Sequence, residues 1–291
     1  MSLLAWLSDL IADNPFESVM ILMNQPLEEF QNYRLAVDRL HVCKDNTEIM
    51  SHLRLDEGHQ HPRLLISSLA DLVSQLLLQP EFFALARQKQ MHFLAIRTNN
   101  HHRRKAHSVD LNQSYLSLLR SLAPAALYNV SPHVSARFIF NQLIQGHQSS
   151  IVVVEKACSA SDKRAVSSSD FKRGIIHLET GRDLCLISCG SMLATAQQVA
   201  QRCQSRGIQC GIVDLFRIKP LDRKELYDTI SRYTYLATIE NHTLIGGLGS
   251  CILETLSQYG KSHAIIQFGI GKDGVPPRVD AIMEKLAWKI W

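Results

Sequence analysis

A glycine-rich corner near the end of the chain is one place where this sequence could arrange chemistry. Gly246, Gly247 and Gly249 lie between an apolar, β-branched segment and residues that repeat at helical spacing. Glycine has no Cβ, so backbone at such a turn can adopt positive φ and let another surface approach closely. The free N–H groups at the start of the following helix point out of the turn. A charged or polar ligand, or a neighbouring subunit, could use this corner, although a GGxG pattern alone is weakly specific.

A cluster of basic residues is the second feature that could bind a ligand. The run His101-His102-Arg103-Arg104-Lys105 holds the densest group of basic residues. Such a run is typical of a solvated loop, and its alternative is a contact with an anion. The formal net charge is only +4, and the excess is scattered along the chain. Composition therefore does not indicate a nucleic-acid partner.

The cysteines indicate neither a metal site nor a disulfide framework. There are seven of them, with no CxxC pair and with several inside strongly apolar segments. This distribution favours reduced, mostly buried thiols. We expect no metal held by side chains of this chain alone.

Hydropathy gives no membrane span, because no uninterrupted apolar run has the length that a bilayer requires. The segment from Met1 to Leu10 has apolar residues but no basic leader, and it carries Asp9. This pattern is typical of an amphipathic helix rather than of a signal peptide. We therefore expect a cytoplasmic protein without membrane association.

The spacing of apolar residues predicts the strands and helices that could position these groups. Short apolar runs alternate with amphipathic stretches along all 291 residues, which is typical of βα units around parallel sheets. The predicted fold class is α/β, with two doubly wound domains whose mostly parallel sheets carry helices on both faces. Strands are expected at 18–22, 63–67, 91–96, 125–128, 151–154, 184–188, 211–214, 236–240 and 264–268, and helices at 69–78, 111–122, 134–145, 192–204, 223–231, 248–259 and 279–288.

A polar stretch divides the chain. Periodicity stops after Cys158, and the run Ser167-Ser168-Ser169-Asp170 reads as loop. We predict a first domain over 1–158, a linker over 159–178 and a second domain over 179–291. Of the 14 glycines only Gly58 and Gly146 precede the linker, so the first domain is poorly equipped to cradle a phosphate.

Four motifs follow one another in the second half of the chain. They are the segment from Gly181 to Met192, Gly207-Ile208, the segment from Val213 to Asp222, and the TIENH and GGLGS segments at 238–250. Four motifs in one order are far more specific than any one of them. Together they resemble the C-terminal domain of the transketolase family of thiamine diphosphate enzymes. In that family the domain chiefly supports the dimer and borders the active site.

The first half resembles the family's pyrimidine-binding domain in outline, through its position, its strand order and the segment from Gly58 to Leu72. Leu69 stands where the family has an aromatic residue. The ring that stacks on the aminopyrimidine is therefore missing there. Phe82 or Phe83 could lie near the cofactor in its place.

The resemblance implies one indispensable carboxylate in the first domain. In such enzymes a glutamate protonates the pyrimidine ring and makes its amino group a base. The family carries this glutamate in a Gly-Ile-x-Glu motif; Glu48 is the best match and Asp45 the second, although the glycine is absent. The alternative is structural, with Asn46 capping a helix and Glu48 in its first turn.

A substrate loop is implied at 98–107, where the family has an acidic Asp-Gly followed by a histidine. His107 takes the place of that histidine, and basic residues replace the acidic ones. The resemblance implies that His107 contacts a substrate hydroxyl or phosphate, while Arg103, Arg104 or Lys105 holds an anion. Simple exposure of His107 is the alternative.

The family's diphosphate-binding domain, with its Gly-Asp-Gly motif and magnesium, has no counterpart in the sequence. Thiamine diphosphate and Mg would then be shared with a partner subunit, as in split transketolases or 2-oxo acid dehydrogenase beta subunits. A homodimer or heterotetramer is implied.

Two functions follow from the resemblance. The first is a transferase subunit of carbohydrate metabolism, which moves a two-carbon or acyl unit from a ketose or 2-oxo acid. The alternative is a degenerate, noncatalytic partner with a structural or regulatory role, favoured by the glycine-poor first domain, the altered glutamate motif and the basic loop.

Overall fold

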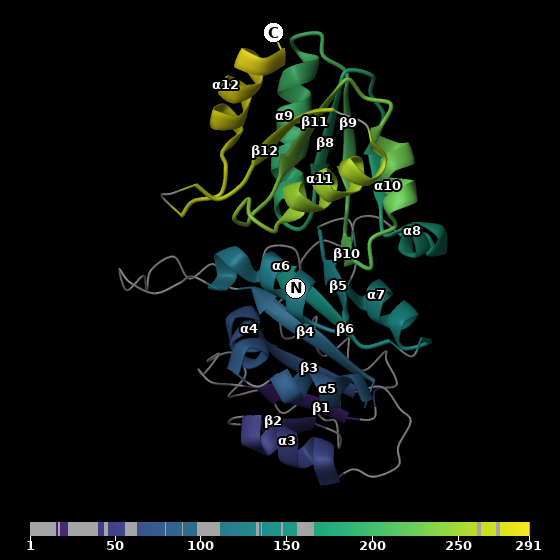
Figure 1. The fold of residues 1–291 in the computed structure, drawn as a ribbon, viewed down its shortest axis with the longest axis vertical. Helices are drawn as coiled ribbons and strands as arrows, with labels where there is room; N and C mark the ends of the chain where they lie inside the picture. Colours follow the sequence, from purple (N-terminus) through teal and green to yellow (C-terminus); the bar gives the residue numbers. More distant parts are fainter. Residues whose placement is uncertain are drawn as a thin grey trace.

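The computed structural model consists of two α/β domains that lie end to end (Figure 1). The first domain carries the purple to teal part of the chain, and the second carries the green to yellow part. The residues that the structure describes are 16, 18–22, 40–43, 46–55, 63–78, 80–88, 90–97, 111–131, 134, 136–146, 148–155, 166–260, 263–271 and 274–290.

Seven strands form the first sheet, in the order β10-β5-β6-β4-β3-β1-β2. Neighbouring strands run parallel except β10 and β5, which are antiparallel. The strands are β1 (Ser18–Leu22), β2 (Leu40–Cys43), β3 (Arg63–Ser68), β4 (Met91–Arg97), β5 (Ala126–Asn129), β6 (Ser150–Glu155) and β10 (Arg217–Lys219).

Helices cover both faces of this sheet. Successive side chains of a buried strand point to opposite faces, so they pack against helices on both sides. Leu65 of β3 belongs to a hydrophobic cluster with side chains of α3, α4, α5 and α6, whereas its neighbours Leu64 and Ile66 belong to a second cluster with α7. The helices are α3 (Asn46–Leu55), α4 (Leu69–Leu78), α5 (Pro80–Gln88), α6 (Leu111–Leu122) and α7 (Ala136–Leu143).

Five strands form the second sheet, in the order β12-β11-β8-β9-β7. They run parallel except for the antiparallel pair of β7 and β9. The strands are β7 (Ile176–Glu179), β8 (Leu184–Ser188), β9 (Cys210–Asp214), β11 (Tyr235–Ile239) and β12 (Ala264–Phe268), and the helices are α8 (Ser168–Arg173), α9 (Met192–Gln204), α10 (Arg223–Ile230), α11 (Leu248–Gln258) and α12 (Val279–Ile290). The predicted fold class is confirmed.

One hydrophobic core runs through both domains. Leu119 of α6 lies in the same buried cluster as Leu248 and Cys251 of α11, and all three side chains are 0% exposed. Burial of this kind contributes about 25 cal/mol per Å² of apolar surface. The contact between α6 and α11 therefore fixes how the carboxyl edges of the two sheets meet.

The predicted linker at 159–178 contains two regular elements, α8 and β7. Ser167 is the N-cap of α8: its side chain accepts from Asp170 N, and the Asp170 side chain accepts from Ser167 N. The serine and aspartate run that reads as loop is thus a capping box. Capping residues and loop residues are the same residue types, so the sequence pattern alone does not distinguish the start of a short helix from a loop.

Among the described residues, no helix combines the length and hydropathy of a membrane span.

Candidate functional site

The carboxyl ends of strands from the two sheets meet at the domain boundary. Arg97 ends β4 and Glu155 ends β6, while Asn241 follows β11 of the second sheet. In open α/β sheets this edge is where ligand-binding side chains collect. In this chain, side chains from the two edges bind one another.

Arg97, Glu155 and Asn241 form a closed polar triangle. Arg97 Nη1 lies 3.4 Å from Glu155 Oε1, and Arg97 Nη2 donates to Asn241 Oδ1 at 3.3 Å. Asn241 Nδ2 donates to Glu155 Oε2, also at 3.3 Å. The Arg97 and Glu155 side chains are 5% and 2% exposed. Each charge is therefore desolvated and depends on the other for compensation.

Asn129 connects α6 with the second sheet. Its Nδ2 donates to Tyr115 Oη at 3.0 Å and to Cys189 Sγ at 3.2 Å. Burial raises the pKa of the Tyr115 hydroxyl and of the Cys189 thiol well above their ordinary values, because desolvation penalises the charged forms. Both groups stay protonated at neutral pH, so neither is an activated nucleophile.

Asp214, at the end of β9, binds the first domain through Ser131. The Ser131 hydroxyl donates a short hydrogen bond to Asp214 Oδ2. Burial raises the pKa of the Asp214 carboxyl to about 7, and the bond from Ser131 acts in the opposite direction. A carboxyl with this pKa suits proton transfer. Asp214 is 0% exposed, however, so its role is in the contact between domains.

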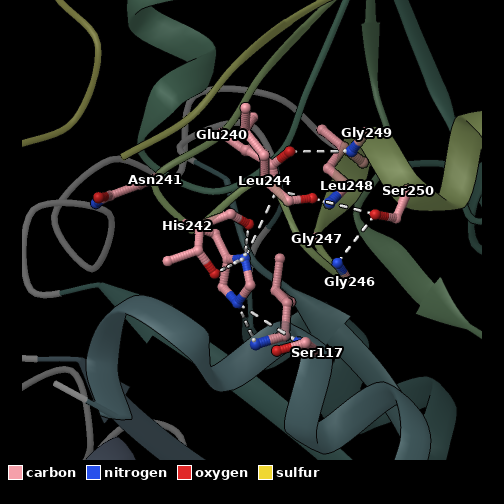
Figure 2. A network of polar contacts seen from close by, with 12 residues as sticks. Ser117, Glu240, Asn241, His242, Leu244, Gly246, Gly247, Leu248, Gly249 and Ser250 are labelled. Atoms are coloured by element: carbon pink, nitrogen blue, oxygen red, sulfur yellow. Dashed lines mark hydrogen bonds and ion pairs between the residues drawn. The ribbon is translucent and has the colours of Figure 1, made fainter. Parts of the chain in front are cut away.

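Glu240 caps the helix that follows the glycine-rich corner. Its two carboxylate oxygens accept hydrogen bonds from Leu248 N at 2.6 Å and from Gly249 N at 3.0 Å (Figure 2). These N–H groups open α11 and have no partner within the helix. Burial raises the Glu240 pKa to about 7, while the two backbone bonds lower it. The chain's own carboxylate thus occupies the position that the sequence leaves open to a polar ligand.

The glycines of this corner give room to Glu240 and to α6. A Cβ on Gly247 would overlap Glu240 Oε2, and a Cβ on Gly246 would overlap the Cβ of Ser117 in α6. Gly246 also has φ +72°, where side chains are strained. The predicted close approach is present, and the surface that approaches is α6 of the same chain (Figure 2).

His242 joins the corner to α6. Its Nε2 accepts from Leu116 N at 3.0 Å and from Ser117 N at 3.4 Å, and its Nδ1 lies 2.5 Å from Thr243 O. An acceptor at Nε2 places the proton of a neutral ring on Nδ1, which donates to Thr243 O. Burial lowers the His242 pKa to about 4. The ring is therefore neutral at physiological pH and serves as a fixed acceptor.

This boundary is a joint between the two domains. The side chains of Arg97, Glu155, Asp214, Glu240 and His242 are all buried there. Among the described residues there is no cluster of three or more His, Cys, Asp or Glu side chains that could hold a metal ion.

Glu48 lies in the first turn of α3, directly after the edge strand β2. Its side chain is half-buried. This position belongs to the carboxyl edge of the sheet, where a carboxylate can face a ligand, and it also suits the helix dipole. Both interpretations made from the sequence therefore remain. Asp45, the second candidate, lies outside the described residues.

Phe82 is a core side chain. It is 1% exposed and packs edge-on against Phe93 at a centroid distance of 5.8 Å. A ring enclosed in this way offers little face for a pyrimidine, and a role of Phe82 in cofactor binding stays a prediction. The side chain of Phe83 lies outside the described residues, as do His107, Arg103, Arg104 and Lys105 of the predicted substrate loop.

The sequence did not identify Arg97, Asn129, Asp214 or His242 as a connected group. Asp214 and His242 fall inside the motifs quoted above, and Arg97 and Asn129 each come directly after a predicted strand and end the observed one. A rule that polar residues at strand ends gather at one edge selects all four, but it does not show that the two edges face each other.

These features define a class: paired, doubly wound α/β domains that meet at their carboxyl edges through a glutamate-capped glycine turn. Residues 174–287 match the family model described as the C-terminal domain of transketolase. The 1-deoxy-D-xylulose-5-phosphate synthase of Acidobacterium capsulatum is 32% identical over 122 residues, which cover 38% of this chain and 20% of that enzyme. The matched part spans a fifth or less of these curated relatives.

Solved structures share the fold over both domains. A split-gene transketolase, described as an inactive beta4 tetramer, superposes with TM-score 0.69 at 20% identity and covers 97% of this chain and 90% of that chain. A 2-oxoglutarate:ferredoxin oxidoreductase from Magnetococcus marinus gives TM-score 0.65 at 10% identity over 100% of this chain and 65% of that chain. The resemblance of the second domain to the C-terminal domain of transketolase is confirmed, and both domains share the fold of these structures.

Proposed function

We propose that this chain is one subunit of a split, transketolase-like enzyme that depends on thiamine diphosphate. The reaction is the transfer of a two-carbon or acyl unit from a ketose or 2-oxo acid. A partner subunit supplies the diphosphate-binding domain and its Mg, in a homodimer or heterotetramer in the cytoplasm. Support comes from the likeness over both domains to a split-gene transketolase, together with Glu48 at the carboxyl edge of the first sheet.

The described residues fit the cofactor in one respect and fail to fit it in another. Glu48 is a half-buried carboxylate on a helix start, which fits the group that must exchange a proton with the pyrimidine ring. Phe82 and Leu69 are buried in the core at 1% and 0% exposure, so neither offers an exposed face for stacking. Thiamine diphosphate, when bound, supplies a nucleophilic carbon for cleavage beside a carbonyl.

Within this proposal, Glu48 holds a proton at a carboxylate oxygen and exchanges it with the ring nitrogen. The boundary joint serves a different purpose, because its contacts keep the two sheets in fixed relation while the partner subunit binds.

The test is a reconstitution of the chain with a polypeptide that carries the Gly-Asp-Gly half, thiamine diphosphate and Mg. Binding of the cofactor is followed by calorimetry, and turnover is followed with ketose and 2-oxo acid donors. We expect Glu48→Gln to bind the partner normally and to lose at least about a hundredfold in turnover, in keeping with general acid–base catalysis.

Glu81→Gln is the matched control, because Glu81 is also an acidic residue in the first turn of a helix of the same domain. Both substitutions remove a charge from a helix start, which costs about 0.3–1 kcal/mol of stability. Only Glu48→Gln is expected to change turnover. Equal cofactor binding and equal turnover in wild type and both variants would remove Glu48 from the reaction.

The polar triangle favours a second function, a noncatalytic structural or regulatory partner. Arg97 and Glu155 end two central strands and neutralise each other, so these two side chains offer no free charge to a substrate. This function predicts a stable complex with the partner in which the wild-type chain adds no cofactor affinity. The same calorimetry therefore separates the two functions.

A further inference from the structure

A cavity of about 470 Å³ lies between the two domains, at a distance from the predicted cofactor carboxylate. Its walls come from the C-terminal half of α6, from β10 and the segment after it, and from α10 and α11. Glu48 lies on α3, at the far end of the first domain from α10 and α11 (Figure 1). The size is in the range of cavities that hold small molecules.

The lining of this cavity carries a positive excess. Arg120, Lys219 and Arg223 contribute three cations, and Glu254 contributes the only carboxylate among the described lining residues. Arg120 Nη2 binds both Glu254 oxygens, at 3.0 and 2.8 Å, and Arg223 Nη2 lies 3.4 Å from Oε2 of the same carboxylate. One negative charge thus serves two guanidinium groups, and the lining keeps a net charge of +2.

The third cation is held in place by backbone. Lys219 Nζ donates to Arg120 O at 2.9 Å and to Ala123 O at 2.7 Å, at the end of α6. An ammonium group has three N–H donors, so one donor is left for a further acceptor. Burial and the neighbouring Arg120 both lower the Lys219 pKa, as is expected where cations gather without enough anions.

The remaining walls are compatible with a small organic anion. Ile218 and Leu221 give an apolar surface, and the hydroxyls of Ser117 and Ser121 lie on the α6 side. Arg120 donates through Nη1 to Gly246 O at 2.8 Å and through Nη2 to Glu254, so it adds positive charge and no free fork. Arg223 Nη1 has no hydrogen-bond partner among the described residues, and with the remaining N–H of Lys219 it provides donors that suit a doubly charged, tetrahedral oxyanion. We propose that this cavity binds the phosphate group of a small phosphorylated compound. This site is independent of the proposed cofactor chemistry.

The test is calorimetric titration of the full chain with inorganic phosphate and pyrophosphate at fixed ionic strength, with acetate as the singly charged comparison. We expect both phosphates to bind more tightly than acetate. Arg223→Gln removes one fork and is expected to weaken pyrophosphate binding about tenfold or more, the effect of losing a charge-assisted hydrogen bond.

Lys224→Gln is the matched control, because it removes one positive charge from the next residue of α10. Lys224 is 78% exposed and pairs with Asp228 at 2.5 Å, outside the cavity. Its variant is expected to bind pyrophosphate within about twofold of wild type, because exposed charges are screened by salt. Equal weakening in the two variants would show a general charge effect and overturn the site.

Ser121→Glu provides a second variant for the event that Arg223→Gln disturbs the fold. Ser121 is an exposed residue of α6 that lines the cavity, so a carboxylate there opposes an anion with little effect on the core. Loss of pyrophosphate binding in a variant with a wild-type urea midpoint supports the proposal. No binding of either phosphate to wild type, or affinity equal to that for acetate, contradicts it.

Discussion

The imidazole Nε2 of His242 accepts a hydrogen bond from the backbone N–H of Leu116, 3.0 Å away in the other domain. The next residue reinforces this contact, because Thr243 N donates to Gln113 O at 2.9 Å. The segment after β11 is thus hydrogen-bonded to the backbone of α6. An acceptor that pairs with buried N–H groups stabilises mainly because its removal leaves them unsatisfied.

We expect His242→Ala to lower the free energy of unfolding by about 2–4 kcal/mol, through unsatisfied N–H groups and a cavity beside Tyr115. His242→Gln should recover part of this loss, since its side-chain oxygen can reach the position of Nε2. Unfolding in urea measures the free energy of both variants.

His263→Ala is the control variant. His263 is half-buried and contacts Ser231 O at 3.2 Å, so its loss should cost about 1 kcal/mol. An equal cost for His242→Ala and His263→Ala would contradict the role of His242.

The protonation of His242 adds a pH signature to the same variants. Its pKa in the fold is about 4, below the ordinary 6.5, so the unfolded chain binds more protons between these values. The stability contributed by the neutral ring is present above pH 6.5 and is lost as the pH falls toward 4. The difference in the free energy of unfolding between wild type and His242→Gln should therefore become smaller as the pH falls from 6.5 to 4.

Asp214→Asn tests the opposite pH dependence. The Asp214 pKa is raised from 3.8 to about 7, so the folded chain binds more protons between these values and loses stability as the pH rises through them. Asparagine keeps an acceptor for Ser131 and has no charge to bury. Relative to wild type, the variant should gain stability between pH 4 and 8, by up to about 4 kcal/mol. The exposed Asp280→Asn (86% exposed) should show no such gain, and a flat difference for Asp214→Asn would contradict the burial of a charge there.

Periodicity in the sequence predicted much of the fold. The bounds of β1, β8, β12, α4, α6 and α9 agree with the predicted ranges, because buried strands and amphipathic helices impose distinct spacings on apolar residues. The antiparallel strand β10 was not predicted. It lies in the second half of the chain but pairs with β5 of the first sheet, and such long-range pairing leaves no local pattern.

The sequence predicted which glycines form the candidate site, but it did not predict which groups these glycines contact. The sequence marked Gly246, Gly247 and Gly249 as a corner that another group approaches closely. That group is Glu240, eight and nine residues from the N–H donors it binds, with α6 beside it. Glycine spacing shows that space is needed, but which side chain enters that space depends on how the two domains pack.

The Arg97 and Glu155 pair gives a third prediction, in the form of a double-mutant cycle. Arg97→Met leaves Glu155 as a buried, uncompensated charge and should cost about 3–5 kcal/mol. Arg97→Met combined with Glu155→Met should recover most of this loss, because the apolar side chains need no partner. Unfolding in urea gives the free energies of wild type, the two single variants and the double variant.

The same cycle on the exposed pair Lys224 and Asp228, each replaced by Ala, is the control and should show a coupling energy of about 0.5 kcal/mol or less. Additive effects at Arg97 and Glu155 would mean that the two charges do not depend on each other.

Gly247→Ala provides the last prediction, on the space that Glu240 occupies. Gly247 has an ordinary φ of −80°, so the backbone itself tolerates alanine. The added Cβ would overlap Glu240 Oε2 and lie 2.8 Å from both His242 Nδ1 and the backbone Thr243 O. Glu240 must then release Leu248 N or Gly249 N, at an expected cost of about 2–4 kcal/mol.

Gly207→Ala is the matched control for this glycine, because it has φ +81° and nothing within 4 Å of its added Cβ. Its expected cost is only the strain of a left-handed residue, about 1–2 kcal/mol. The cycle with Glu240→Ala completes the test: once the carboxylate is gone, the largest overlap disappears and the close approaches to His242 Nδ1 and Thr243 O remain, so Gly247→Ala should cost clearly less than it does in wild type. If Gly247→Ala costs as much without Glu240 as with it, the overlap with the carboxylate is not the cause. A smaller additional cost shows that the glycine is needed to admit the carboxylate that caps α11.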